Sequence, residues 1–313
     1  MRNDTAFIGF GEAAMAFARD GAARGYDRKT LAATTRAAKL ADFESAGIWA
    51  CDSAADAIAG ATVILSLVTA DQALAAASEA APHLEPQALW LDMNSVAPDT
   101  KRAAAAVIHA AGARYVDVAV LAPVHPARLA VPLLVSGPHA EAGKAALAEF
   151  GFTNIRIVAG DVGAASTIKM IRSVMVKGLE ALTTEWILAA DAAGIRDEAV
   201  AALNASWPDT DWAEKADYNL DRMMLHGLRR AAEMEEVVKT LDGLGTGSAM
   251  TRGTVARQRA IGLLGLSPAP TLSAKLDALS VAPAQAGASS GTGSPDYQKT
   301  PAFAGVTESE MSA

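Results

Sequence analysis

Short apolar runs alternate with alanine-rich helical stretches over about the first 160 residues of the chain. The apolar runs predict strands at Ala6–Ile8, Leu31–Thr34, Val63–Leu67, Leu89–Asp92, Tyr115–Val120, Leu133–Ser136 and Asn154–Val158. The stretches between the early runs predict helices over 13–24, 37–44, 70–81 and 98–111. This alternation is typical of a doubly wound, mostly parallel sheet with helices on both faces. Such a sheet binds ligands in a crevice at the carboxyl ends of its strands.

The pattern changes at about Asp161, where strand-like runs end and a helical period begins. One apolar stripe with a spacing of about 3.6 residues predicts a long helix that stops at Gly194. The stripe consists of Ile168, Ile171, Met175, Leu179, Leu182, Trp186 and Ala190. A helix of about thirty residues spans about 45 Å, which suits a spine that joins two domains. Further helices are expected over 197–206, 212–241 with breaks, 247–264 and 272–279.

These patterns divide the chain into three parts. Residues 1–160 are expected to form an α/β Rossmann domain, and residues 161–280 an all-α domain. Residues 281–313 are a low-complexity tail, which we expect to be disordered because its composition cannot bury much apolar surface.

Composition narrows the class of protein. Hydrophobic residues make up 51% of the 313 residues, and the formal charge is −8. An acidic chain is poorly suited to bind nucleic acid or an anionic membrane, so we expect neither partner. The N-terminus runs directly into a strand, and no apolar run is long enough to cross a membrane, so a cytoplasmic protein is expected. The single Cys51 excludes an internal disulfide, and no ligand spacing indicates a metal site.

The first strand ends in the motif G-x-G-x-x-A, which is Gly9, Gly11 and Ala14. In a dinucleotide-binding unit the first glycine allows the tight turn, and the second lets the backbone approach a pyrophosphate. The third small residue lets the helix pack on the strand. We therefore assign the whole turn to the cofactor, including the intervening residues Phe10, Glu12 and Ala13.

The second strand decides which dinucleotide is expected. A carboxylate at its end would bind the ribose hydroxyls of NAD, whereas an arginine would favour the 2′-phosphate of NADP. If the second strand is Leu31–Thr34, Thr35 and Arg36 follow it and no acid occupies its end. The sequence on this placement predicts NADP(H), with NAD(H) as the alternative.

A lysine in the second half of the chain is the candidate for proton transfer. Gly160 and Gly163 precede a helix on which Ser166, Lys169 and Ser173 share one face. A lysine at a domain junction can donate or accept a proton, and desolvation would lower its pKa toward the useful range. We assign Lys169 as general acid/base and Ser173 as a second catalytic residue that helps to position it, with Ser166 in contact with the substrate.

The combination of motifs resembles the β-hydroxyacid dehydrogenase superfamily, which includes the 6-phosphogluconate dehydrogenases, over residues 5–280. The resemblance implies a Rossmann domain followed by an all-helical domain, a homodimer with interlocked helical domains, and Lys169 at the position of the family's acid/base lysine. It also places Asp92-Met93-Asn94-Ser95 on an Asp-x-Ser-Thr motif. Four residues after the middle strands are accordingly assigned to the cofactor: Leu67, Val68, Asn94 and Ser95.

The chain departs from the family pattern where the family binds its substrate. A serine of that pattern aligns with Leu121, and the two glycines after it become Ala122 and Pro123. The paired asparagines after the lysine become Arg172 and Ser173. The resemblance is therefore to a divergent branch with its own type of C-terminal helical domain, and a 6-phosphogluconate substrate is not implied.

Other polar side chains can replace the lost substrate contacts. Spacings of three, four and seven put His226, Arg229 or Arg230, and Glu233 on one face of a helix. Arginine suits bidentate binding of a carboxylate or phosphate, so our hypothesis is that Arg172 with Arg229 or Arg230 holds an acidic group. The alternative is an ordinary charged helix face with Arg–Glu pairs. His125 falls in the altered loop and is expected to line the pocket.

The sequence thus predicts an NADP-dependent oxidoreductase that moves a hydride between nicotinamide and a small hydroxy acid or its carbonyl form. Two alternatives remain open. One is an imine or ketone reductase of the same architecture, which the apolar Leu121 segment would suit. The other is a dinucleotide-binding protein without turnover.

Overall fold

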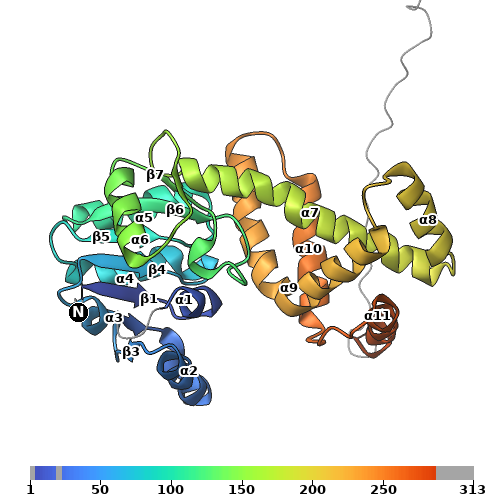
Figure 1. Cartoon of the computed structure of the whole chain (residues 1–313), viewed down its shortest axis with the longest axis horizontal. Coiled ribbons are helices and arrows are strands. Elements are labelled where there is room, and N and C mark those ends of the chain that lie inside the picture. The colour runs from blue at the N-terminus through green and yellow to red at the C-terminus, as the bar shows by residue number, and fades with distance from the viewer. Residues whose placement is uncertain (1–3, 19–22, 287–313) are drawn as a thin grey trace, which may run out of the picture.

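The computed structural model describes residues 4–18 and 23–286, which form a sheet domain and a helical domain (Figure 1). The sheet has eight strands in the order β3-β2-β1-β4-β5-β6-β7-β8, and every neighbouring pair is parallel except β6 and β7. The strands are β1 (Thr5–Ile8), β2 (Arg24–Tyr26), β3 (Trp49–Ala50), β4 (Val63–Ser66), β5 (Leu89–Asp92), β6 (Arg114–Val120), β7 (Leu133–Ser136) and β8 (Ile155–Ile157).

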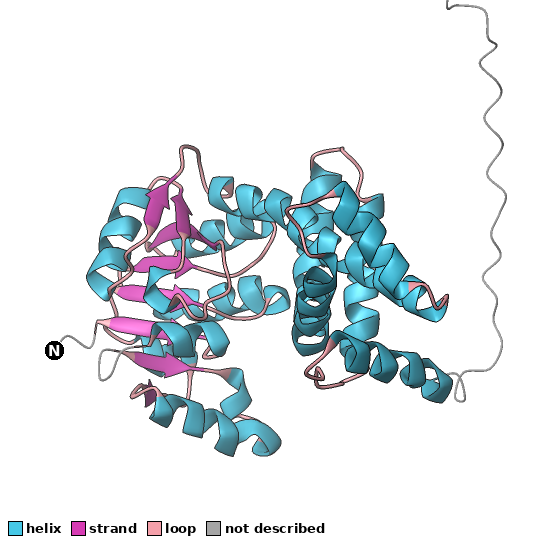
Figure 2. Cartoon of the chain, turned by 45° about the vertical axis from the view of Figure 1, so that its right-hand side comes forward, coloured by secondary structure: helices cyan, strands magenta, loops and turns pink. Residues whose placement is uncertain are grey.

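Helices cover both faces of this sheet (Figure 2). They are α1 (Glu12–Phe17), α2 (Ala33–Ser45), α3 (Ala54–Ile58), α4 (Ala73–Ala80), α5 (Pro98–Ala110) and α6 (Ala140–Phe150). Successive strand side chains point to opposite faces, so Leu65 and Leu91 join one buried cluster while Ile64 and Trp90 join another. Burial on both faces explains why the central strands are continuous apolar runs.

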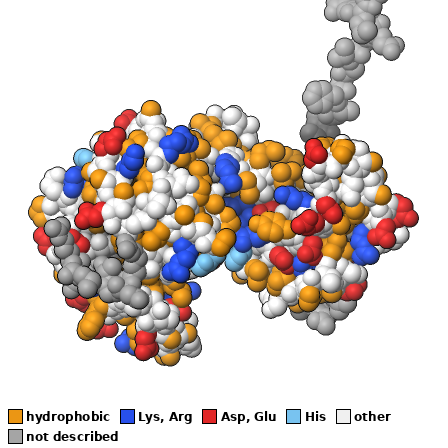
Figure 3. Space-filling view, in the orientation of Figure 1, with side chains coloured by type: hydrophobic (Ala, Val, Ile, Leu, Met, Phe, Trp, Pro, Cys, Tyr) orange, Lys and Arg blue, Asp and Glu red, His pale blue; other side chains and the backbone are white. Residues whose placement is uncertain are grey.

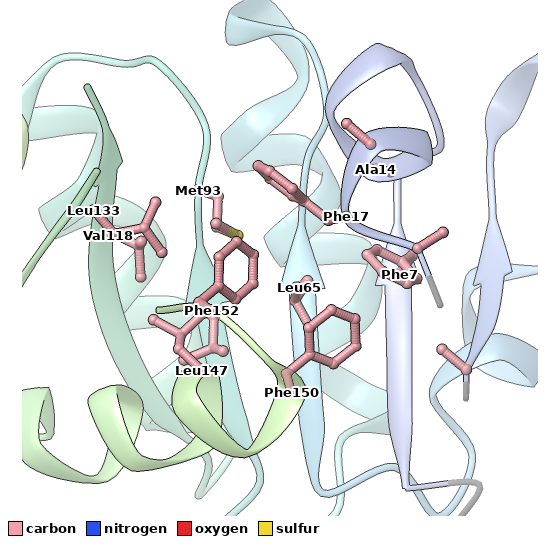
Figure 4. Packing of buried hydrophobic residues seen from close by; sticks show 14 of the residues in the cluster. Phe7, Ala14, Phe17, Leu65, Met93, Val118, Leu133, Leu147, Phe150 and Phe152 are labelled. Atoms are coloured by element: carbon pink, nitrogen blue, oxygen red, sulfur yellow. The ribbon is translucent and has the colours of Figure 1, made fainter. Parts of the chain in front are cut away.

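The cluster beneath α6 is dominated by aromatic rings (Figure 4). Phe7 of β1 meets Phe150 of α6 edge-to-face, with ring centroids 5.9 Å apart. Phe17 of α1 meets Phe152 in the same way at 4.9 Å. These contacts fix α1, and with it the glycine turn, against the sheet.

The prediction of the second strand at Leu31–Thr34 is wrong. The second strand is β2 (Arg24–Tyr26), and the predicted helix over 13–24 ends at Phe17. Residues 31–34 instead lead into α2, and Leu31 is exposed. The true strand has a glycine and an arginine among three residues, so it lacks an apolar run, and its pairing with β1 and β3 holds it in place. The short elements β3 and α3 were not predicted either, nor was the 11-residue helix α6.

Five helices make up the second domain, and α7 (Ala164–Ala192) is the predicted spine. The others are α8 (Arg196–Ser206), α9 (Trp212–Gly243), α10 (Ala249–Leu263) and α11 (Leu272–Ala286). The predicted breaks in α9 are absent, because it continues for 32 residues. At Gly227 it meets Gly262 of α10 so closely that a Cβ on Gly262 would lie 2.5 Å from the Leu228 nitrogen.

The predicted tail overlaps the last helix. α11 continues to Ala286 through an alanine-rich stretch, which favours helix, and residues 287–313 of the predicted tail lie outside the described residues. Within the described part of the chain, none of the helices is both long and apolar enough to span a membrane.

Candidate functional site

A cavity of about 1140 Å³ lies between the two domains. The sheet domain contributes the glycine turn, the residues after β2, and the loops after β4, β5 and β6. The helical domain contributes one face each of α7 and α9. Figure 3 shows Lys and Arg side chains gathered along the hollow between the domains. The cavity thus occupies the carboxyl ends of the parallel strands, where a doubly wound sheet binds ligands.

The glycine turn fits a dinucleotide. Gly9 has φ +86°, and a Cβ there would lie 2.7 Å from the Leu67 carbonyl oxygen, so only glycine suits the turn. Gly11 lines the cavity, and a Cβ on it would meet nothing within 4 Å, so the space before it is open. No side chain caps the start of α1, which leaves amide N–H groups for a pyrophosphate. The buried Ser95 hydroxyl also lines this cavity and has no hydrogen-bond partner in the described chain.

Most of the predicted cofactor residues line the cavity: Gly9, Gly11, Glu12, Ala13, Leu67, Val68, Asn94 and Ser95. Phe10 and Ala14 do not, because both are buried in the core beneath the turn. Asn94 also organises the loop, since its side chain accepts from the Val68 amide at 2.7 Å and donates to Ser66 Oγ at 2.9 Å.

The residues assigned to the 2′-phosphate need correction, because the strand before them was misplaced. Thr35 and Arg36 lie on α2 outside the cavity, and Arg36 bonds to the Thr30 carbonyl oxygen. The first residue after β2 is Asp27, and its carboxylate accepts from the Phe10 amide at 2.8 Å and the Lys29 amide at 2.9 Å. Arg28 and Lys29 follow it and line the cavity. The premise that no acid ends the second strand is therefore wrong.

A buried charge network fastens α7 to the sheet. Lys101 of α5 bonds Asp92 Oδ1 at 2.9 Å and lies 3.4 Å from Asp117 Oδ1, with all three side chains fully buried. The other Asp117 oxygen accepts from the backbone amides of Gly163 and Ser166 at 3.1 Å each. A carboxylate at this place satisfies free N–H groups and the positive end of the α7 dipole.

Ser166 belongs to this anchor and not to the substrate side. Its hydroxyl is buried, bonds to Asp117 at 3.1 Å and does not line the cavity. The first turn of α7 has free amides that need an acceptor, and Asp117 accepts from the amide of Ser166 as well as from its hydroxyl. Because the anchor fixes the start of α7, it also fixes the direction in which Lys169 points.

Lys169 faces the cavity as predicted from its position on α7. Among the described residues it makes no hydrogen bond or ion pair. Burial lowers its pKa to about 8; Glu233 opposes this shift, while Lys177, Lys101 and Arg229 add to it. Ser173, one turn further on, is buried and also lines the cavity. The site therefore holds an amine whose proton is exchangeable near neutral pH.

The predicted arginines are mostly paired. Arg229 donates to Glu233 at 2.6 Å, an i,i+4 pair of the kind that the sequence left open as an alternative. Arg230 is buried and donates through Nε to Glu180 at 3.0 Å, with a second bond from its Nη2. Arg172 lines the cavity with no ion pair to any described residue. Of the three arginines, it is the one whose charge is uncompensated.

The two predicted histidines lie elsewhere. His125 is exposed and outside the cavity, whereas Leu121 does line it. His226 lies outside this cavity and lines a separate one between α9 and α10. The spacing of seven residues between His226 and Glu233 predicted one shared helix face. In the structure the two side chains line different cavities.

Several cavity residues were not predicted. Lys177 donates to Glu233 at 2.6 Å, and Glu180 binds Arg230. Lys177 and Glu180 follow Lys169 by eight and eleven residues on one helix. This helical spacing was the signal in the sequence that could have placed them near Lys169. Lys215 and Arg222 of α9 also line the cavity. In total ten Lys or Arg and six Asp or Glu line it, so the cavity is cationic although the chain carries a charge of −8.

The described residues contain no group of His, Cys, Asp and Glu side chains that could hold a metal ion.

A glycine turn after β1, a cavity at the strand ends and a lysine supplied by a helical domain together define a two-domain protein of the NAD(P)-dependent oxidoreductase type.

Comparison with known families agrees with this class. Residues 4–152 match the NAD binding domain of 6-phosphogluconate dehydrogenase, and residues 190–261 match a domain of unknown function, DUF1932. The chain thus joins an NAD binding domain like that of 6-phosphogluconate dehydrogenase to a separate type of C-terminal helical domain, as the resemblance to a divergent branch implied.

Similar proteins match between 59% and 90% of this chain. A conserved hypothetical protein from Sinorhizobium meliloti 1021 is 36% identical, with a TM-score of 0.66 over 90% of this chain and 97% of that chain. An uncharacterized 28.5 kDa protein from Methanothermus fervidus is 28% identical over 187 residues, which are 59% of this chain and 69% of its own length. The 3-hydroxyisobutyrate dehydrogenase of Mycobacterium tuberculosis is 17% identical, with a TM-score of 0.65 over 89% of this chain and 99% of that chain, and shares the fold.

Proposed function

We propose that this protein is an NADP(H)-dependent oxidoreductase that interconverts a small hydroxy acid and its carbonyl form, with Lys169 as the general acid/base. The observation that carries the proposal is the amine of Lys169. It faces the cavity opposite the glycine turn, is unpaired among the described residues, and has a pKa lowered to about 8. A bound nicotinamide dinucleotide would supply or accept the hydride at this place.

The protein's own residues account for the proton. In oxidation, the neutral amine of Lys169 takes the proton of the substrate hydroxyl; in reduction, the ammonium returns it to the carbonyl oxygen. Ser173 Oγ lies one turn along the same face and is suited to orient that oxygen. The buried Asp117 anchor keeps this helix face directed at the cavity.

The preference for NADP(H) now rests on Arg28 and Lys29 and not on Arg36. Arg28 and Lys29 both line the cavity, and neither of these two makes an ion pair with a described residue. Asp27 opposes a 2′-phosphate, but two backbone amides already share its charge. We expect Arg28→Ala to weaken NADPH binding about tenfold, the loss of one charge-assisted contact, and to leave NADH binding unchanged. Arg36→Ala is the matched control; equal binding of both dinucleotides by the unaltered protein would refute the preference.

An acidic substrate is supported by Arg172, the uncompensated arginine on the same helix as Lys169. The apolar segment from Leu121 to Pro123 lines the cavity as well, and this favours the imine or ketone reductase as the second candidate. The two candidates differ in Arg172→Ala, which should raise KM for a hydroxy acid and leave KM for an uncharged ketone or imine unchanged.

A homodimer is also proposed, on the basis of an exposed stripe on α7. Five apolar residues with helical spacing are between 39% and 63% exposed: Ile168, Ile171, Met175, Leu179 and Leu182. An apolar stripe of this length on a helix that spans the domain suits a second copy of the chain. Met175→Glu should produce a monomer in light scattering, whereas Leu31→Glu, an equally exposed site on the sheet domain, should not.

The reaction is tested by following absorbance at 340 nm with NADP⁺ across small hydroxy acids and sugar acids, beside Lys169→Ala. Turnover that disappears in the variant supports the proposal. Tight NADPH binding with no turnover on any hydroxy acid, ketone or imine would favour a dinucleotide-binding protein without catalysis.

A further inference from the structure

One carboxylate at the edge of the cavity is shared by two cations. Glu233 Oε2 accepts from Lys177 Nζ at 2.6 Å, and Glu233 Oε1 accepts from Arg229 at 2.6 Å. The Glu233 side chain is 13% exposed and that of Lys177 is 7% exposed, so the pair is largely removed from water. Each oxygen of Glu233 is therefore occupied by a cation, one from α7 and one from α9.

Lys169 lies about two turns before Lys177 on α7 and lines the same cavity. The charged groups that act on it come from three elements: Glu233 and Arg229 of α9, Lys177 of its own helix and Lys101 of α5. Lys101 is held between Asp92 and Asp117. Glu233 is thus the carboxylate that could become the counter-ion of Lys169.

We propose that Lys177 is a positioning residue that occupies Glu233 and so keeps Lys169 free of a direct carboxylate partner. The inference deepens the proposed function, because an acid/base lysine bound to a carboxylate would be held away from the substrate oxygen. Burying the charge of a lysine costs free energy unless a carboxylate pairs with it. Glu233 pairs with Lys177 in this way, and Lys177 itself takes no part in the proton transfer.

Removing the charge of Lys177 and removing the charge of Glu233 should shift the pKa of Lys169 in opposite directions. Burial lowers the pKa of Lys169 to about 8, and Lys177 contributes to the lowering. Without Lys177, an oxygen of Glu233 becomes available to Lys169, so the pKa of Lys169 should rise toward its ordinary value. Without the negative charge of Glu233, the remaining cations should lower that pKa further.

The experiment measures Lys169 directly in the full chain. Acetic anhydride acetylates neutral amines, so labelling at a series of pH values, followed by peptide mass spectrometry, gives the titration of Lys169. The variants are Lys177→Met, Lys177→Arg and Glu233→Gln, with Lys144→Met on the exposed face of α6 as the matched control. Thermal melting establishes that each variant is folded.

We expect the Lys169 inflection to move up by at least about one pH unit in Lys177→Met, a tenfold change in neutral amine, and to move down in Glu233→Gln. Lys177→Arg should restore it, and Lys144→Met should leave it unchanged. An unmoved inflection in folded Lys177→Met, or a failure of arginine to restore it, would overturn the inference. If Lys177→Met does not fold, an unmoved or upward inflection in Glu233→Gln would do the same.

The labelling requires neither cofactor nor substrate. Absence of turnover in the 340 nm assay would therefore refute the proposed function while leaving the titration result intact.

Discussion

The two sides of the interdomain cavity are built in different ways. On the sheet side, a dinucleotide would meet backbone from a turn of adjacent residues, with Gly9 and Gly11 at its centre. On the helical side, the charges are set by pairs between α7 and α9, and the partners in those pairs lie 56 and 50 residues apart in the sequence. A turn depends on the φ and ψ of its own residues, whereas a charge pair depends on how two helices pack. The side with the glycine turn is thus local, and the side with Lys169 is a product of tertiary packing.

The largest expected effect is on kcat in Lys169→Ala, a change on the helical side of the cavity that should leave NADPH binding on the sheet side nearly unaltered. Lys169→Ala should lower kcat by about a thousandfold, because general acid/base catalysis contributes about 10²–10⁴. The dissociation constant for NADPH should change less than twofold, since the lysine lies across the cavity from the glycine turn. Steady-state kinetics and a fluorescence titration measure the two. Loss of cofactor binding would show that the sides are not separable.

The next effect tests how far the helical side depends on helix packing. Gly262→Ala should destabilise the protein by about 2–3 kcal/mol, because its Cβ would lie 2.5 Å from the Leu228 nitrogen of α9. Gly253→Ala on the same helix has nothing within 4 Å and should be neutral or stabilising by up to about 1 kcal/mol. Urea unfolding of both variants gives the comparison. Equal stabilities would contradict the close crossing of α9 and α10.

A smaller effect sharpens the comparison within the glycine turn. Gly9→Ala should cost about 1–3 kcal/mol of stability because φ is +86° and the Leu67 carbonyl oxygen is 2.7 Å from its Cβ. Gly11→Ala should leave stability unchanged, since its Cβ points into open space, but weaken the dinucleotide about tenfold. Melting temperatures and isothermal titration of NADPH distinguish the two. Unaltered NADPH affinity in Gly11→Ala would argue against the turn as the pyrophosphate site.

The smallest effect is a pH dependence. Oxidation requires the neutral amine of Lys169, so its rate should rise through an inflection near pH 8, and reduction requires the ammonium and should fall through the same inflection. Between pH 7 and pH 9 the neutral fraction increases about tenfold for a pKa of about 8. Initial rates in both directions measure this. Oxidation that is flat over this range would exclude Lys169 as the titrating base.

The amino-acid sequence by itself determined the class of fold and the central chemical groups. A G-x-G-x-x-A turn, buried apolar strands and a long helical stripe are local signals, so β1, β4, β5, β6 and α7 were predicted close to their bounds. Lys169, Arg172 and Ser173 of the predicted helix line the cavity, because helical spacing along α7 is a local signal.

Only the tertiary structure decided which strand comes second and which charges are free. Arg24–Tyr26 is a strand because β1 and β3 pair with it. Its misplacement put the predicted 2′-phosphate site at Arg36, which lies outside the cavity that Arg28 lines. Ser166 went to the Asp117 anchor, and Arg230 went to Glu180. Hydrogen bonds and ion pairs between distant segments form only when packing brings them together, and a pattern along one chain does not record that distance.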